Sequence, residues 1–207
     1  MQTVRGDADS VERRLVAGLL RCPCSGVLRP WSHAASRVIR TPLGPKELRP
    51  RRSRCGVCGT THVLLPTWLF ARRGYAGVII WACVLAWAAG VKVASIAARA
   101  RVPVSTVAEW LRRIGDRGPR LRQVLMGVLA VVDGQVREVV PAGSALSDAV
   151  TVLGAVVAGV RRRGGLLATL TDQEMVSHLT RGLLLAPACD LGSCNTNPFV
   201  LPAPNSS

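Results

Sequence analysis

Acidic residues are scarce in this sequence. Its 207 residues include 12 Asp and Glu against 27 Lys and Arg, which gives a formal net charge of +15. Glu47 is the only acid between Arg13 and Ala108, although basic residues occur throughout that span. A GC-rich genome would explain why Arg outnumbers Lys, but it would not explain the missing acids. The imbalance indicates an anionic partner, either nucleic acid or an anionic membrane surface.

Aromatic residues are also scarce, at 4% of the chain, whereas 49% of the residues are hydrophobic. We therefore expect a core packed mainly from Ala, Val and Leu, in one or two small domains. Residues 1–14 are polar and of mixed charge, so no secretory signal is expected. The seven cysteines then indicate thiols or metal ligands rather than disulfides. We expect a cytoplasmic, nucleoid-associated protein.

No hydrophobic run is long enough to suggest a membrane span. The longest uncharged apolar run, Ala76–Val91, has 16 residues, and a spanning helix needs roughly 20. Trp81 and Trp87 lie about 9 Å apart along a helix, too close to mark the two faces of one bilayer. We expect this run to be the buried first helix of a compact trihelical unit.

Composition divides the chain into five segments. Residues 1–20 are expected to form a polar segment with a short helix, and residues 21–66 a zinc-ribbon-like module of small strands and turns. Residues 75–115 are expected to form a helix-turn-helix domain, residues 119–186 a helical C-terminal region, and residues 187–207 a disordered tail. The predicted fold class is mostly α: a small zinc-ribbon-like N-terminal module, a trihelical helix-turn-helix and additional C-terminal helices.

The C-terminal region carries two helix-start signals. Ser144 is a good N-cap for a helix that ends in three arginines before Gly164. Thr171 and Glu174 form a capping-box pattern for a helix that is expected to reach about Leu185. These helices present apolar stripes, which predicts either a homodimer that would suit a palindromic DNA site or simple cover for the DNA-binding unit.

Two cysteine pairs have the spacing of metal ligands. Cys55 and Cys58, followed by Gly59, form a zinc-knuckle pattern in which both thiolates face one ion. Cys22 and Cys24 lie about 30 residues upstream, with Pro23 between them. Because a structural zinc ion takes four ligands, these cysteines are the candidate set. Which cysteine of Cys-Pro-Cys binds the ion stays open. The alternative fourth ligands are His33 and His62.

Residues 96–111 have the pattern of a helix-turn-helix. Val102 is the apolar residue of the turn, and Pro103 can begin the second helix. Val107, Trp110 and Leu111 follow the spacing of an inward face, which leaves the opposite face for base edges and phosphates. The DNA contacts are expected from these residues: Arg51, Arg52, Arg54, Arg101, Val104, Ser105, Thr106, Glu109, Arg112 and Arg113.

Four stretches carry a resemblance to a known family: "CPCSGVLRPW", "LRPRRSRCGVCGTTHVLLP", "ARRGYAGVIIWA" and "IAARARVPVSTVAEWLRRI". Residues 20–115 resemble a bacterial family of uncharacterised helix-turn-helix proteins whose N-terminal zinc ribbon is similar to that of insertion-sequence transposases. The family pattern has two residues between the first two cysteines, and this chain has one. The resemblance implies DNA binding near mobile elements and supplies no reaction. It is strongest at Arg54, Cys55, Cys58, His62, Leu64, Leu65 and Pro66.

Catalysis is not expected. A transposase core needs about three carboxylates around two metal ions, and the acids beyond residue 115 lie mostly at helix starts or in linkers. We expect a non-catalytic, sequence-specific protein that binds double-stranded DNA, as a mobile-element accessory or a transcription regulator. Its expected cofactor is a structural zinc ion, and no small-molecule substrate is expected. The alternatives are a membrane-associated protein that uses residues 76–91 and a zinc-ribbon adaptor for other proteins.

Overall fold

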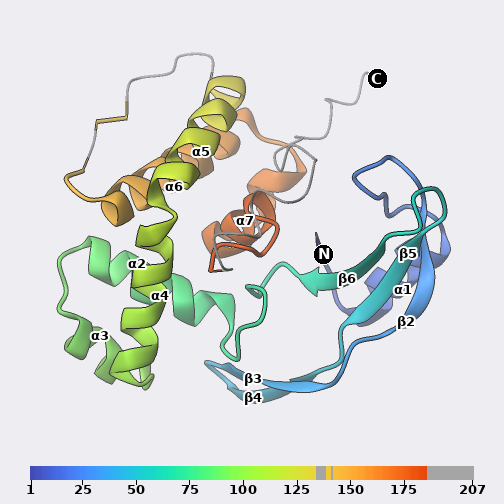
Figure 1. The fold of residues 1–207 in the computed structure, drawn as a ribbon, viewed down its shortest axis with the longest axis horizontal. Helices are drawn as coiled ribbons and strands as arrows, with labels where there is room; N and C mark the ends of the chain where they lie inside the picture. The colour runs from blue at the N-terminus through green and yellow to red at the C-terminus, as the bar shows by residue number, and fades with distance from the viewer. Residues whose placement is uncertain (134–138, 141, 186–207) are drawn as a thin grey trace.

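The computed structural model describes residues 1–133, 139–140 and 142–185. The first third of the chain is rich in strands and the rest is helical, and the two parts lie at opposite sides of Figure 1. The described chain is 49% helical and 20% strand. The predicted mostly α class is therefore wrong, because the segment around the cysteines forms a real mixed sheet rather than a few short strands on a helical protein.

Four strands form the main sheet: β1 (Gln2–Val4), β2 (Leu28–His33), β5 (Arg51–Cys55) and β6 (Thr61–Pro66). Their order is β1-β6-β5-β2, with β1 parallel to β6 and the other pairs antiparallel. Helix α1 (Ala8–Val16) begins at Asp7, whose carboxylate caps the helix, and ends earlier than residue 20. Its apolar side, Val11 and Leu15, packs with Leu28 and Leu64 in a small core.

A separate hairpin extends from the sheet toward the helical part, formed by β3 (Arg37–Thr41) and β4 (Gly44–Leu48). Ile39 is fully buried and packs with Leu65, Leu69 and Ala76. The small strands expected in residues 21–66 include β3 and β6, whose stretches "SRVIRT" and "THVLLP" have the β-branched and apolar composition of strands. Strands β2, β4 and β5 are rich in Arg, Pro or Gly and give no alternating apolar pattern, and β1 has only three residues.

Helices α2 (Gly77–Ala88), α3 (Val93–Ala100) and α4 (Val104–Asp116) form the trihelical unit. Gly90 takes a φ of 83° just after α2, a conformation that favours glycine after a helix end. Helix α2 is nearly uniformly apolar, and Ile80 and Val84 are fully buried.

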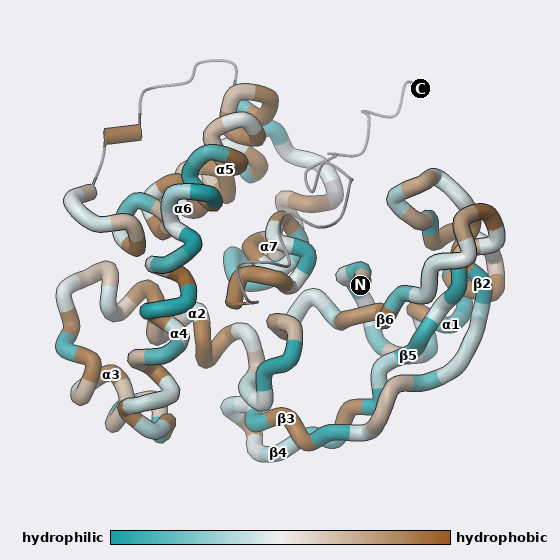
Figure 2. Tube along the Cα trace, in the orientation of Figure 1, coloured by the Kyte–Doolittle hydropathy of each residue, from teal (hydrophilic) through white to brown (hydrophobic). Residues whose placement is uncertain are grey.

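Among the described residues no helix combines the length and apolarity needed to cross a membrane. Figure 2 shows the hydrophobic colour concentrated in the helical part and hydrophilic stretches along β5.

Helices α5 (Gly118–Val132) and α6 (Ala145–Arg163) pack side by side along their length and close the helical core. Ser144 caps α6 through its hydroxyl, as predicted. The predicted apolar stripe of α6 is buried in the core of the same chain. Packing within one chain thus explains the apolar stripe from which a homodimer was predicted. The homodimer itself stays a prediction.

Helix α7 (Asp172–Leu179) begins with the predicted capping box but ends six residues before Leu185. It lies between the sheet and the helical core (Figure 1). The Gln173 Nε2 donates to the Thr67 carbonyl at 2.9 Å, and the Ser177 Oγ donates to the Leu69 carbonyl at 2.7 Å. Both side chains are buried, so α7 holds the strand-rich part and the helical part together through hydrogen bonds shielded from water.

The five segments predicted from composition have bounds close to those of the described elements. Their assignment as separate domains remains a prediction. The expected disordered tail, residues 187–207, lies outside the described residues, and so do Cys189 and Cys194.

Two glycines of α5 provide a matched test of the packing of α5 against α6. A Cβ on Gly118 would lie 2.1 Å from the Ala145 carbonyl oxygen, whereas a Cβ on Gly127 would meet nothing within 4 Å. Gly118→Ala should lower the free energy of unfolding by about 1–3 kcal/mol because backbone atoms must separate. Gly127→Ala should raise it by about 0.5–1 kcal/mol. Urea unfolding followed by circular dichroism measures both, and equal effects of the two variants would contradict the described close approach of the two helix starts.

Candidate functional site

Four cysteine sulfurs meet at one end of the main sheet. Cys22, Cys24, Cys55 and Cys58 place their Sγ atoms within 4.8 Å of one another. They come from the turn before β2 and from the end of β5 with the turn that follows. Cys22 and Cys55 are buried in the small core beneath α1, and Cys24 and Cys58 are exposed. Such a group can hold a metal ion, and both cysteines of Cys-Pro-Cys belong to it.

The sulfur separations match a shared ion better than a covalent bond. The Sγ atoms of Cys24 and Cys55 lie 3.5 Å apart, and those of Cys22 and Cys58 lie 3.7 Å apart. A disulfide bond is about 2.05 Å long. Four thiolates about 2.3 Å from one central ion occupy the corners of a tetrahedron with edges of about 3.8 Å. The described pairs are close to that edge length.

The turn at residues 22–26 explains how Cys22 and Cys24 can face one ion with a single residue between them. The Ser25 amide donates to the Cys22 carbonyl at 2.8 Å, and the Cys22 amide donates to the Gly26 carbonyl at 2.8 Å. Pro23 occupies the second position of this turn, which its fixed φ favours. Ser25 takes a φ of 68°, in the left-handed region. The chain therefore reverses within four residues and returns both sulfurs to the same side.

The second pair lies in the predicted knuckle. The Gly59 amide donates to the Cys55 carbonyl at 3.2 Å, and the Cys55 amide donates to the Thr60 carbonyl at 2.9 Å. Gly59 has a φ of 69°, which glycine adopts without a steric penalty. Gly26 lies opposite the knuckle, and a Cβ there would be 2.6 Å from the Cys55 Sγ. Glycine at position 26 lets the two ligand turns approach each other.

Hydrogen bonds prepare part of the cluster for the thiolate form. The hydroxyl and amide of Thr60 lower the pKa of the Cys58 thiol to about 6. Amide donors from Cys58 and Val57 lower the pKa of Cys55. Burial raises the pKa of the Cys22 thiol to about 12. A divalent cation among the four sulfurs would favour the thiolate at every position, because the ion is the largest local charge.

The two predicted alternative ligands occupy different places. His62, on β6, is buried, and its Nε2 lies 3.3 Å from the Cys22 Sγ. It therefore suits a supporting position in which an imidazole N–H donates to a ligand thiolate. His33 lies at the far end of β2, pairs with Arg51 in the sheet register and is not part of the four-sulfur group.

Burial agrees with the expected inward face of α4, whereas the residues expected to face outward differ in exposure: Thr106, Glu109 and Arg113 are half-buried. Their contacts with DNA stay a prediction. Val107, Trp110 and Leu111 are buried, and Val104, Ser105 and Arg112 are exposed. Val102 is buried in the turn. Arg101 ends α3 with a φ of 52° and a ψ of 44°, so this arginine adopts the left-handed conformation that glycine commonly supplies. The side chain of Arg101 is exposed.

Ion pairs balance the charge along the outer side of α4. Both oxygens of Glu109 accept hydrogen bonds from Arg112, and Arg113 also donates to it. Arg112 reaches Asp116 as well. Hydrogen bonds from Arg112 and then Arg113 lower the pKa of Glu109 to about 2. Because exposed ion pairs of this kind are weak, these arginines can exchange a carboxylate for a phosphate.

The three arginines of β5 do not share one face. Arg51 points to the α1 side and forms a bidentate pair with Glu12, and it also donates to the Ser32 carbonyl. Arg52 and Arg54 alternate to the other side of the strand. The Arg54 guanidinium lies 5.0 Å from the ring centroid of Trp31, which is 55% exposed. Arg51 is thus neutralised within the chain, while Arg54 remains exposed on an open sheet face.

Pattern reasoning missed several residues that shape these surfaces. Trp31 and Arg29 join Arg54 on the open face of the sheet, because Arg29 pairs with Arg54 across β2 and β5. Thr60 supports Cys58, whose Sγ lies 3.3 Å from the Thr60 Oγ1. A Thr two residues after the last knuckle cysteine was the available signal for Thr60. No signal indicated Trp31, because its position beside Arg54 depends on the bulge between Pro30 and Ser32.

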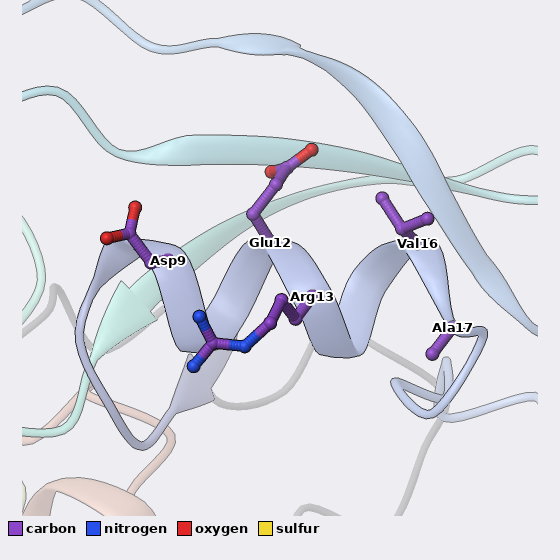
Figure 3. Close-up of a pocket in the computed structure, with 5 residues that line it drawn as sticks. All are labelled: Asp9, Glu12, Arg13, Val16 and Ala17. Carbon is purple, nitrogen blue, oxygen red and sulfur yellow. The ribbon is translucent and has the colours of Figure 1, made fainter.

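A shallow depression on α1 shows no comparable chemistry. Figure 3 shows its lining, with the side chains of Glu12 and Arg13 directed away from each other. Glu12 is already paired with Arg51, and the remaining lining residues are Asp9, Val16 and Ala17. Its two carboxylates, Asp9 and Glu12, do not belong to any group of three or more metal-ligating side chains found among the described residues.

The chain matches no family model, no curated protein and no solved structure in the comparisons with known proteins. The function can therefore be inferred only from the geometry of the four-cysteine cluster and from the surfaces around α4.

Removing a ligand should release the metal ion. Cys24→Ser and Cys55→Ser should each lower the bound metal from about one equivalent per chain to well below one, because a hydroxyl is a poor replacement for a thiolate. The control is Cys83→Ser: Cys83 is buried in α2 outside the cluster, so this variant should keep the metal even if it is less stable. Elemental analysis of the dialysed proteins measures the ratio. Full metal content in Cys55→Ser would show that the cluster is not the binding site.

Gly26 and Gly56 test the close approach of the two ligand turns. Gly26→Ala should weaken metal binding roughly tenfold or more, because the added methyl group must displace a ligand sulfur. Gly56→Ala is the matched control, since its nearest neighbour would be the Arg29 Nε at 3.5 Å, an ordinary contact. Competition with a chromogenic chelator gives both affinities. Similar affinities for the two variants would argue against the described packing.

Proposed function

We propose that this protein binds double-stranded DNA through α4 and that a zinc ion bound by Cys22, Cys24, Cys55 and Cys58 stabilises its N-terminal ribbon. The observation that carries the proposal is the geometry of residues 93–116. Two short helices meet at the left-handed residue Arg101, and the first turn of the second helix is exposed at Val104 and Ser105. An exposed helix N-terminus of this kind suits the major groove.

Charge supports the same partner. The chain has a formal net charge of +15. Lys92, Arg99 and Arg101 are exposed around the helix-turn-helix. In the proposed complex Ser105, Thr106 and Val104 face base edges, and Arg101, Arg112 and Arg113 contact phosphates. A base contact from Glu109 would require its pairs with Arg112 and Arg113 to open.

The ribbon adds a second basic surface. Arg52 and Arg54 lie on the sheet face opposite α1, and we propose that they contact the DNA backbone. Arg51 is a weaker candidate because Glu12 already holds its guanidinium. Zinc fits the cluster because four thiolates are a structural zinc ligand set and leave no open position for catalysis. The protein would then be a non-catalytic, nucleoid-associated transcription regulator or mobile-element accessory.

A zinc-ribbon adaptor that binds other proteins is the alternative. The exposed apolar side chains Val38, Leu43 and Val57 would suit a protein partner, whereas Arg29 and Arg54 on the open face of the sheet favour an anionic one. An adaptor and a DNA-binding protein are expected to differ in how strongly salt weakens their binding to the partner.

A mobility-shift titration tests the proposal. The wild-type protein should bind random duplex DNA at low salt and lose roughly a thousandfold or more in affinity between about 50 and 200 mM salt, if six or more phosphates are contacted. A duplex selected from a random pool should then bind more tightly than the random duplex. Absence of binding to any duplex at low salt would refute the proposal and leave the adaptor reading.

Arg101→Gly separates the fold of the turn from its proposed contact. Glycine relieves the left-handed conformation, so the free energy of unfolding should rise by about 1 kcal/mol. Loss of the guanidinium should nevertheless weaken DNA binding and lower the salt slope by about 1. The matched control is Arg13→Gly on α1, an exposed arginine remote from the helix-turn-helix, which should leave the salt slope unchanged. An unaltered slope in Arg101→Gly would remove this residue from the interface.

A further inference from the structure

The β3–β4 hairpin is attached to α4 by a continuous series of side-chain contacts. The Arg40 guanidinium lies 5.2 Å from the ring centroid of Tyr75. The Tyr75 ring in turn lies 5.3 Å from the Trp110 ring of α4, edge to face at 76°. Geometry of this kind is favourable for both cation–π and aromatic pairs. The position of the hairpin is therefore coupled to the helix that the proposed function places in the major groove.

Backbone hydrogen bonds hold the same junction. The Arg40 amide donates to the Gly74 carbonyl at 2.8 Å, and the Ala76 amide donates to the Arg40 carbonyl at 2.8 Å. Ile39 is fully buried beside Ala76. On the other strand, the Lys46 ammonium lies 5.4 Å from the ring centroid of Trp68. The hairpin is therefore held to the rest of the chain close to its tip, at Ile39 and Arg40 of β3 and at Lys46 of β4.

The tip of the hairpin is exposed and apolar. Pro42 and Leu43 connect Thr41 to Gly44, and Leu43 is 100% exposed. The Thr41 hydroxyl donates to the Gly44 carbonyl at 2.7 Å, which keeps the tip in one conformation. A single exposed leucine is ordinary on a protein surface. Leu43 differs in its position, because it ends an ordered hairpin whose strands carry the exposed cations Arg40 and Lys46. It suits a partner that takes an apolar wedge.

Cations lie on both sides of this tip. Arg40 and Lys46 are exposed, and Glu47, the only acid of the hairpin, accepts a hydrogen bond from Ser36, the residue before β3. Arg73, two residues before Tyr75, is half-buried and donates to the Leu185 carbonyl, so it is held within the chain. The exposed cations beside the tip are therefore Arg40 and Lys46.

We propose that the β3–β4 hairpin binds the minor groove of duplex DNA beside the major-groove site of α4. This inference rests on the proposed function. The minor groove is about 6 Å wide, so only the Pro42–Leu43 tip enters it. Arg40 and Lys46 contact the phosphates on either side. Apolar wedges flanked by basic residues are a known means of binding this groove. The ribbon and the helix-turn-helix then read one continuous site.

The test introduces a negative charge at the tip. Leu43→Glu should bind the selected duplex about tenfold more weakly than wild type, because the carboxylate faces phosphates. Hydroxyl-radical footprinting should show that protection is lost on one flank of the site. Methylation of guanine N7 by dimethyl sulfate should remain blocked at saturating protein, because α4 still occupies the major groove. The matched control is Leu19→Glu, at an exposed leucine after α1, which should change neither affinity nor footprint.

The results separate the two proposals. Wild-type affinity and an unchanged footprint in Leu43→Glu would overturn the hairpin contact while leaving DNA binding by α4 intact. Failure of the wild-type protein to bind any duplex would instead overturn the proposed function, and the hairpin contact with it. Because Leu43 is fully exposed, the variant should keep the circular dichroism spectrum and metal content of the wild type, and both are measured alongside.

Discussion

Four sulfurs held within 4.8 Å of one another are the constraint on which the N-terminal half depends. The core beneath them contains few apolar side chains, among them Val4, Leu15 and Leu28, and a core of that size supplies little stability. As thiolates, the four cysteines would repel one another. A dication among them would convert that repulsion into a cross-link between the turn at residues 22–26 and the knuckle at residues 55–60. Strands β2, β3, β4 and β5 lie between these two turns in the chain.

The second organising feature is α7, which comes late in the chain and joins its two halves. Its buried Gln173 and Ser177 satisfy backbone carbonyls in the segment after β6. Gly182 follows with a φ of 72°, and a Cβ there would lie 2.5 Å from the Leu65 Cδ2. The position of the ribbon relative to the helix-turn-helix is therefore set by residues remote from both in sequence. That placement is what brings the β3–β4 hairpin beside α4.

Charge is distributed according to this architecture. Arg51 is neutralised by Glu12 on the α1 side of the sheet, whereas Arg54 on the opposite side is exposed. Along α4 the C-terminal half is balanced by Glu109 and Asp116, and the first turn presents Ser105 and Val104. The balanced charges therefore lie along the C-terminal half of α4, whereas Lys92, Arg99 and Arg101 are exposed before its first turn.

The sequence by itself determined the local features. The knuckle at Cys55–Cys58, the turn at Val102, the caps at Ser144 and Thr171 and the inward face of α4 all depend on residues a few positions apart, so pattern and propensity suffice. The mostly α class was wrong because the strands of the ribbon are Arg- and Pro-rich and are held by pairing partners distant in sequence. Only the tertiary structure decided that both Cys22 and Cys24 join the cluster, that Arg51 is paired, and that Arg40, Tyr75 and Trp110 connect the hairpin to α4. Those contacts join residues 31 to 39 positions apart, and no local pattern encodes the distance between them.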